Sequence, residues 1–224
     1  MSTKLKAYII TILLFGGLGF WIFGDYLPSV PKTDFFKNLF KTEEKEPNPT
    51  TKRTYKKSSG KEGQVIDTYK GVNVYYNGSV KNIFGRNKTK DGYNLGLKYQ
   101  CVEFGKRFFY QAYNHKMPNA GGNAADFFNA DLGHGEFNVG RGMYQFRNGQ
   151  NKKPRKDDMG IIGPSRDNKF GHLFIITNVD ESGVNFIQQN PGSQNPSRGK
   201  YKLIYSNGNW TIKAPNLVGW LRMP

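Results

Sequence analysis

The sequence predicts an α+β fold in which one helix packs on a small antiparallel sheet, and two patterns support this. From Cys101 onward, small or apolar residues recur at i, i+3, i+4, i+7, i+8 and i+11, which is the stripe of an amphipathic helix over Cys101–Ala112. Further along, the apolar runs 171–179 and 184–190 flank Asp180–Gly183, which is typical of a β-hairpin. A helix followed by paired strands indicates the α+β class.

The other strands are predicted from alternation and turn residues. Residues 72–76 alternate and end at Asn77–Gly78, so they indicate a strand and a turn. A second hairpin is expected around Asn207–Gly208, because Asn-Gly is a strong two-residue turn signal. Residues 217–222 are expected to form a closing strand.

Other parts of this region are polar. Residues 79–96 and 131–150 are rich in glycine and asparagine, so we expect loops there, the second rimming a cleft. On the helix, Glu103, Lys106 and Arg107 fall on the face opposite the apolar stripe.

Composition limits the partners and the chemistry. The chain has 33 basic and 17 acidic residues, a net charge of +16, and residues 61–224 carry 23 and 12 of them, or +11. Such a surface suits an anionic partner such as a cell-wall polymer. No nucleic-acid module accompanies the dispersed charge, so no nucleic-acid partner is expected. One cysteine excludes an intramolecular disulfide, and three scattered histidines lack zinc-ligand spacing, so we expect no metal and no cofactor.

The N-terminal part predicts a membrane anchor. Ala7–Phe23 is an uninterrupted apolar run at the low end of the length of a membrane-spanning helix, about 17–25 residues. It follows the basic residues Lys4 and Lys6. The positive-inside rule then places the N-terminus in the cytoplasm and the folded domain outside it. A cleaved signal peptide is the alternative, although the run lacks a good small-residue cleavage site. We expect an anchor over 1–24, a flexible linker over 25–60 and a folded domain over 61–224.

Cys101 is the first candidate for chemistry. It lies in the first turn of the predicted helix, where unpaired N–H groups and the helix dipole lower the pKa of a thiol. The alternative is an inert, buried small residue. A histidine such as His172 could take the thiol proton, and a third side chain would orient the imidazole.

The register of the hairpin decides which side chains accompany His172. We predict a three-residue loop, Glu181–Ser182–Gly183, which places Ile176 opposite Gln188. His172, Gln188 and Asn190 then project from one side of the sheet. A two-residue loop would separate His172 from Gln188, because one step of register reverses every side chain.

Four motifs carry a resemblance to a known family: YQCVEFGKRF, GHLFIIT, FIQQN and VGWLR. They resemble the CHAP family (cysteine, histidine-dependent amidohydrolases/peptidases), and the likeness is closest to the amidase domain of glutathionylspermidine synthetase/amidase. With GVNVYY it spans residues 71–222. The resemblance implies a papain-like fold.

The resemblance also implies roles for individual residues. Cys101 would be the nucleophile and His172 the general base and then acid. The third member is commonly a glutamate, and here its place is taken by Gln188, with Asn190 as the alternative orienting residue. The backbone N–H of Cys101, with the weaker candidate Gln100, would stabilise the oxyanion.

Three functions remain open at this stage. The first is a membrane-anchored cysteine amidohydrolase/peptidase that cleaves peptidoglycan peptides. The second is an amidase for a small amide such as a glutathione–polyamine conjugate. The third is a catalytically degenerate wall-binding module, which the glutamine at position 188 keeps under consideration.

Overall fold

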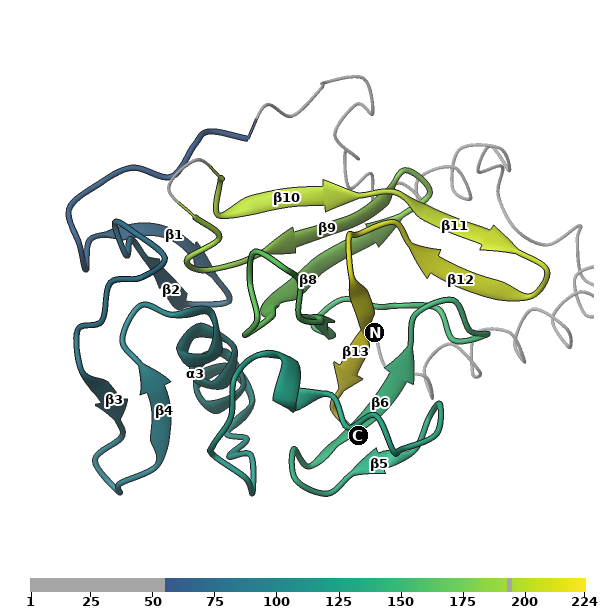
Figure 1. The fold of residues 1–224 in the computed structure, drawn as a ribbon, viewed down its shortest axis with the longest axis horizontal. Coiled ribbons are helices and arrows are strands. Elements are labelled where there is room, and N and C mark those ends of the chain that lie inside the picture. Colours follow the sequence, from purple (N-terminus) through teal and green to yellow (C-terminus); the bar gives the residue numbers. More distant parts are fainter. Residues whose placement is uncertain (1–54, 193–194) are drawn as a thin grey trace, which may run out of the picture. The chain divides into compact units, whose positions relative to one another are not determined.

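The fold is built on a seven-stranded sheet with the strand order β10-β9-β8-β7-β13-β6-β5, and every neighbouring pair is antiparallel (Figure 1). The structure is a computed structural model that describes residues 55–192 and 195–224. The strands of this sheet are β5 (Phe137–Asn138), β6 (Met143–Arg147), β7 (Met159–Ile162), β8 (His172–Asp180), β9 (Gly183–Ile187), β10 (Arg198–Tyr201) and β13 (Leu217–Arg222).

In residues 55–192 and 195–224, three two-stranded hairpins and two helical segments accompany the large sheet. The hairpins are β1 (Val65–Tyr69) with β2 (Val72–Tyr75), β3 (Arg86–Lys88) with β4 (Asn94–Leu97), and β11 (Leu203–Ser206) with β12 (Asn209–Ile212). The helical segments are α3 (Cys101–Tyr113) and the 3-10 turn η1 (Ala125–Phe127). This mixture confirms the α+β class, and the strands near 72–76 and 217–222 and the hairpin turn at Asn207–Gly208 are present as predicted.

Helix α3 is covered on both of its faces, because it contacts β8 on one side and β2 and β4 on the other (Figure 1). Phe104 and Phe108 are buried in one core cluster with Leu173 of β8. A Cβ at Gly105 would lie 2.7 Å from Leu173 Cδ1, so this glycine allows the helix to approach the strand closely. The apolar stripe therefore packs against the sheet, as the spacing predicts.

Three residues of the polar face of α3 are also buried, which the amphipathic pattern alone does not indicate. Glu103, Lys106 and Arg107 are 1%, 0% and 4% exposed. Arg107 Nη1 donates to the Asn73 carbonyl of β2 at 2.7 Å, and Lys106 Nζ donates to the Asn94 carbonyl of β4. The hairpins β1–β2 and β3–β4 cover this face and accept its hydrogen bonds.

The two segments expected to be loops contain short strands. Residues 79–96 include β3 and the start of β4, and residues 131–150 include β5 and β6. In β6 the inward-facing Gln145 is fully buried and accepts hydrogen bonds from the Asn129 N–H and from Asn138 Nδ2. A core-facing polar residue interrupts the apolar alternation that identifies a strand, which explains why the sequence pattern misses β6.

The residues described lie in one compact unit, Arg53–Pro224. Within this part of the chain, no helix is long and apolar enough to cross a membrane. The predicted anchor over 1–24 and most of the predicted linker over 25–60 lie outside the described residues.

Candidate active site

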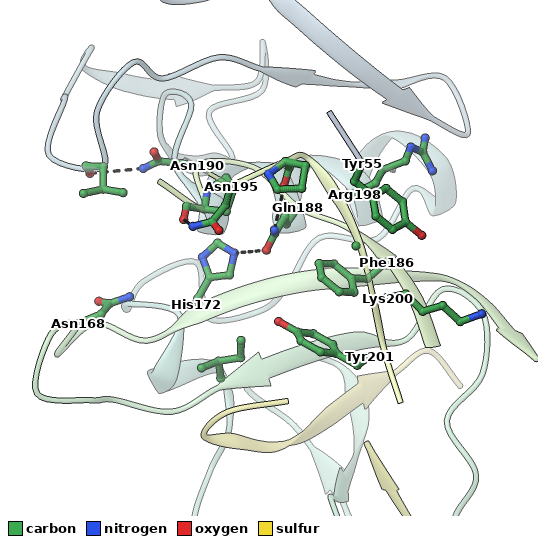
Figure 2. A pocket seen from close by; sticks show the side chains of 15 residues that line it. Tyr55, Asn168, His172, Phe186, Gln188, Asn190, Asn195, Arg198, Lys200 and Tyr201 are labelled. Atoms are coloured by element: carbon green, nitrogen blue, oxygen red, sulfur yellow. Dashed lines mark hydrogen bonds between the residues drawn. The ribbon is translucent and has the colours of Figure 1, made fainter. Parts of the chain in front are cut away.

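His172 is the first residue of β8 and faces a cleft of about 540 Å³ (Figure 2). The preceding Gly171 has a φ of +71°, and a Cβ there would lie 2.4 Å from the Ile162 carbonyl oxygen, so only glycine fits before the histidine. The cleft is lined by Tyr55, Val80, Ile162, Asn168, His172, Phe186, Gln188, Asn190, Pro191, Asn195, Pro196, Arg198, Gly199, Lys200 and Tyr201. No residue of this lining is acidic.

The turn of the β8–β9 hairpin differs from the predicted one. Asp180 pairs with Gly183, so the loop has the two residues Glu181 and Ser182 rather than three. Asp180 Oδ1 accepts the Ser182 N–H at 2.9 Å, which closes the short turn. Taken alone, this turn would place His172 and Gln188 on opposite sides of the sheet.

A β-bulge restores the two side chains to one side. Thr177 has no partner on β9, and beyond it Ile176 pairs with Phe186 rather than with Ile187, the partner that the two-residue turn would give without a bulge. The extra residue shifts the register by one step and reverses the facing of everything before it. His172 and Gln188 therefore meet, although the predicted loop length was wrong.

The hydrogen bond between His172 and Gln188 defines the tautomer of the imidazole. His172 Nε2 lies 3.0 Å from Gln188 Oε1, and Gln188 Nε2 donates to the Pro196 carbonyl at 3.0 Å (Figure 2). The amide oxygen can only accept, so His172 Nε2 carries the proton and Nδ1 keeps its lone pair. The neutral ring therefore presents a base at Nδ1.

Cys101 begins α3, as predicted, and its thiol lies beside β8. The N–H groups of Leu173, Val102 and Cys101 itself act on the thiol and lower its pKa, which places the sulfur next to the residue that follows His172. Cys101 keeps part of its surface exposed, but it is not among the residues lining the cleft. Among the hydrogen bonds of the described residues, none joins Cys101 to His172.

Burial controls the charge states of both groups. Burial raises the pKa of the Cys101 thiol to about 11, which outweighs the three N–H groups that lower it. The expectation of a lowered thiol pKa at the helix start is therefore wrong for this environment. Burial also lowers the pKa of His172 to about 4, against the raising effect of the Gln188 hydrogen bond. At neutral pH the pair is a thiol and a neutral imidazole.

Asn190 and Gln100 contact each other rather than His172. Asn190 Nδ2 donates to Gln100 Oε1 at 2.7 Å and to the Val80 carbonyl at 3.3 Å. Gln100 Nε2 donates to the carbonyls of Val80 and Asn82 at 3.2 and 2.9 Å. Both side-chain N–H groups of Gln100 are engaged, so the loop around residues 80–82 would have to release them before they could reach an oxyanion.

A buried polar cluster on α3, close to Cys101 in the sequence, was not identified from the sequence. Arg107 Nε donates to Glu103 Oε1 at 2.6 Å, and Gln189 Nε2 donates to Glu103 Oε2 at 2.9 Å. Glu103 and Arg107 are four residues apart, which is the spacing of a helical ion pair. That spacing was the available signal, but it does not distinguish an exposed pair from a buried one. In the described residues no group of histidine, cysteine, aspartate and glutamate side chains is arranged to hold a metal ion.

Comparison with known proteins bears on the family of this chain. Residues 90–190 match the family model of the CHAP domain, a range that includes Cys101, His172 and Gln188, and the match confirms the family resemblance seen in the motifs. Trypanothione synthetase of Crithidia fasciculata is 30% identical over 151 residues, which are 62% of this chain and 23% of that protein. The chain thus spans about a quarter of the length of this curated relative. A crystal structure of the wild-type endolysin LysIME-EF1 aligns with 65% of this chain and 61% of its own, at 18% identity and a TM-score of 0.35.

Changing Gln188 to glutamate should shift the pH dependence of Cys101 alkylation to lower pH. In the wild type, the raised thiol pKa predicts that the rate with iodoacetamide climbs about tenfold per pH unit above neutrality. A carboxylate beside Nε2 would raise the pKa of His172, and the resulting imidazolium would lower the pKa of the thiol. The Gln188→Glu variant should therefore react faster than the wild type at pH 7, and its turnover should be preserved or increased.

Asn190→Asp is the matched control, because it makes the same change at an amide that does not touch His172. We expect its alkylation profile to follow that of the wild type. A severe loss of turnover in Gln188→Glu with an intact fold would contradict the assignment and move the orienting role to Asn190.

Proposed function

We propose that this protein is a cysteine-dependent amide hydrolase in which Cys101 is the nucleophile, His172 the general base and then acid, and Gln188 the residue that orients the imidazole. The observation that carries the proposal is the His172–Gln188 hydrogen bond, because it leaves the Nδ1 lone pair available as a base. The helix that begins with Cys101 and packs against β8 of the antiparallel sheet supports a papain-like arrangement. The CHAP family match supports the reaction class.

The reaction begins from neutral groups. As the Cys101 sulfur attacks the amide carbonyl, its proton passes to His172 Nδ1 and the carbonyl π electrons move to the oxygen. The backbone N–H of Cys101 stabilises that oxyanion. Collapse of the tetrahedral intermediate re-forms the carbonyl and breaks the C–N bond, while the imidazolium returns its proton to the leaving amine. A water molecule, deprotonated by the same imidazole, then attacks the thioester; the C–S bond breaks, the acid product leaves, and the imidazolium returns its proton to the Cys101 sulfur.

Gln188 has a narrower role than a glutamate would have. Its oxygen orients the ring and accepts the Nε2 proton, but a neutral amide adds no charge to stabilise the imidazolium. The pKa of His172 is low, so the ring is neutral in the resting site and is charged only while it carries the transferred proton.

The cleft favours a peptide substrate over a polyamine conjugate. Its charged lining residues are the cations Arg198 and Lys200, and the described lining contains no carboxylate. Both cations are already paired, Arg198 with Asp67 at 2.9 Å and Lys200 with Asp180 at 3.2 Å, so a polycationic arm would find no free carboxylate in the lining. The +11 charge of residues 61–224 adds to this preference and suits peptides attached to an anionic wall polymer. We propose peptidoglycan stem or cross-bridge peptides as the substrate class.

The test compares two substrates on the same protein. Purified sacculi and glutathionylspermidine are incubated with the full chain and with Cys101→Ala, and newly released amines are quantified. Amine release from sacculi by the wild type but not by Cys101→Ala would support the peptide substrate. If the wild type releases amines only from glutathionylspermidine, the small-amide alternative is supported. If neither substrate yields amines above the level of Cys101→Ala, the wall-binding module would replace the enzyme.

We also propose that residues 1–24 anchor the chain in a membrane, with the N-terminus in the cytoplasm and the catalytic domain on the other side. The apolar run Ala7–Phe23 and the preceding lysines support this orientation. Protease added to intact cells should then remove the folded domain, and full protection of the domain would contradict the proposed topology.

A further inference from the structure

Gln189 connects the two halves of the proposed site through its side chain. It directly follows Gln188 and is 0% exposed. Its Nε2 donates to the Gln100 carbonyl at 3.0 Å and to Glu103 Oε2 at 2.9 Å. The amide thus links the segment that carries Gln188 to the first turn of α3.

The orientation of the Gln189 amide is determined by its other contacts. Its Oε1 accepts the Tyr75 N–H at 2.8 Å and an Arg107 Nη2 proton at 3.3 Å. Arg107 and Tyr75 offer only donors there, and Glu103 offers only acceptors, so the amide cannot be rotated by half a turn without placing like groups together. In this orientation the amide oxygen accepts two hydrogen bonds and the amide nitrogen donates two, so the buried side chain is fully hydrogen-bonded.

The Gln100 carbonyl is the point at which this matters for chemistry. The same carbonyl also accepts the Phe104 N–H at 3.2 Å, the first hydrogen bond of the helix. It belongs to the peptide group whose N–H is that of Cys101, the backbone donor of the proposed mechanism. A peptide group is planar, so a bond that holds its carbonyl also holds its N–H. Donation to the carbonyl further polarises the group and strengthens the N–H as a donor.

We propose that Gln189 is a positioning residue for the oxyanion site: it holds the Gln100–Cys101 peptide plane in register with the Gln188–His172 pair. The inference rests on the proposed function, because it assigns the Cys101 N–H a part in stabilising an oxyanion. Gln189 itself touches neither the thiol nor the imidazole in the structure. Its effect should therefore be confined to reactions that convert a carbonyl into a tetrahedral centre whose oxygen accepts the Cys101 N–H.

Two reactions of the same sulfur separate this role from a general effect on the thiol. Alkylation by iodoacetamide forms a carbon–sulfur bond, releases iodide and the thiol proton, and develops no oxyanion. Addition to the peptide aldehyde N-acetylglycinal forms a carbon–sulfur bond, moves the carbonyl π electrons to oxygen, and transfers the thiol proton to that oxygen to give a hemithioacetal. The affinity of the aldehyde is measured by its protection of Cys101 against iodoacetamide, so the test does not depend on turnover.

The variant is Gln189→Met, which keeps the side-chain length and removes all four hydrogen bonds. Gln111→Met, at an exposed position of the same helix, is the matched control. We expect Gln189→Met to be alkylated within about threefold of the wild type but to bind the aldehyde about 10–100-fold more weakly, because a displaced donor loses much of its stabilisation. Turnover per alkylatable thiol should fall by a similar factor, with a smaller change in KM.

Two outcomes would overturn the proposal. One is aldehyde affinity equal to that of the wild type in folded Gln189→Met. The other is a loss of aldehyde affinity matched by an equal loss of alkylation rate, which indicates general damage to the site. A wild-type protein that binds the aldehyde but hydrolyses neither sacculi nor glutathionylspermidine would instead count against the proposed function, so the two failures are distinguishable.

Discussion

Replacing Cys101 with alanine should reduce turnover to background, a loss of at least about 10³-fold, because no other thiol is present to form the acyl intermediate. The fold should persist. Cys101 is partly exposed, and its side chain only borders the core that contains Phe104 and Leu173, so we expect the free energy of unfolding to change by about 1 kcal/mol or less. The measurements are amine release from the substrate that the wild type cleaves and urea unfolding of both proteins.

Cys101→Ser provides the control for shape, since a hydroxyl occupies nearly the same space but is a far weaker nucleophile at this pH. It should be as inactive as the alanine variant and as stable as the wild type. Activity near the wild-type level in either variant would show that Cys101 is not the nucleophile, and the amide-hydrolase mechanism proposed above would fail with it.

Local patterns predicted the elements of the fold well, and long-range geometry explains the errors. The apolar stripe from Cys101 identifies α3 because helix periodicity depends only on neighbouring residues. The β8–β9 register depends on the bulge at Thr177, which no local turn signal reveals. The prediction that His172 and Gln188 share one side of the sheet was nevertheless correct, because the shorter turn and the bulge each shift the register by one residue in the same direction, and a shift of two residues leaves the facing of the side chains unchanged.

In the candidate site, too, local patterns gave correct predictions and long-range contacts explain the error. The pairing of His172 with Gln188 follows from strand order and the period of two, and the structure contains it. The charge state of Cys101 was predicted wrongly because the helix start was weighed without the burial around it. Desolvation depends on residues distant in sequence, such as those of β8, and here it exceeds the effect of the nearby N–H groups.

The largest omission was the buried polar cluster on α3. Helix periodicity places Glu103 and Arg107 on the polar face of the helix, but it does not indicate what covers that face. The cover comes from β1–β2, which precedes the helix, and from Gln189, which lies 82 residues beyond Arg107. Both contacts depend on tertiary structure.

Replacing Arg107 with methionine should destabilise the domain by about 3–5 kcal/mol, the cost of leaving one member of a buried ion pair without its partner. Arg107 Nε and Nη2 donate to Glu103 at 2.6 and 3.2 Å, and its guanidinium carbon lies 4.8 Å from the centre of the Tyr75 ring. Without it, the Glu103 carboxylate would retain only the amide donors of Gln189 and Asn87. The free energy of unfolding in urea measures the effect.

The exposed pair Arg166–Asp167 serves as the control, since its side chains are 95% and 87% exposed and Asp167→Asn should leave unfolding unchanged. The double variant Glu103→Leu, Arg107→Met should be more stable than Arg107→Met alone, because it removes the stranded carboxylate together with its partner. A cost below about 1 kcal/mol for Arg107→Met would mean that water reaches Glu103. The first turn of α3, and the Cys101 peptide group within it, would then be held by Gln189 without support from the ion pair.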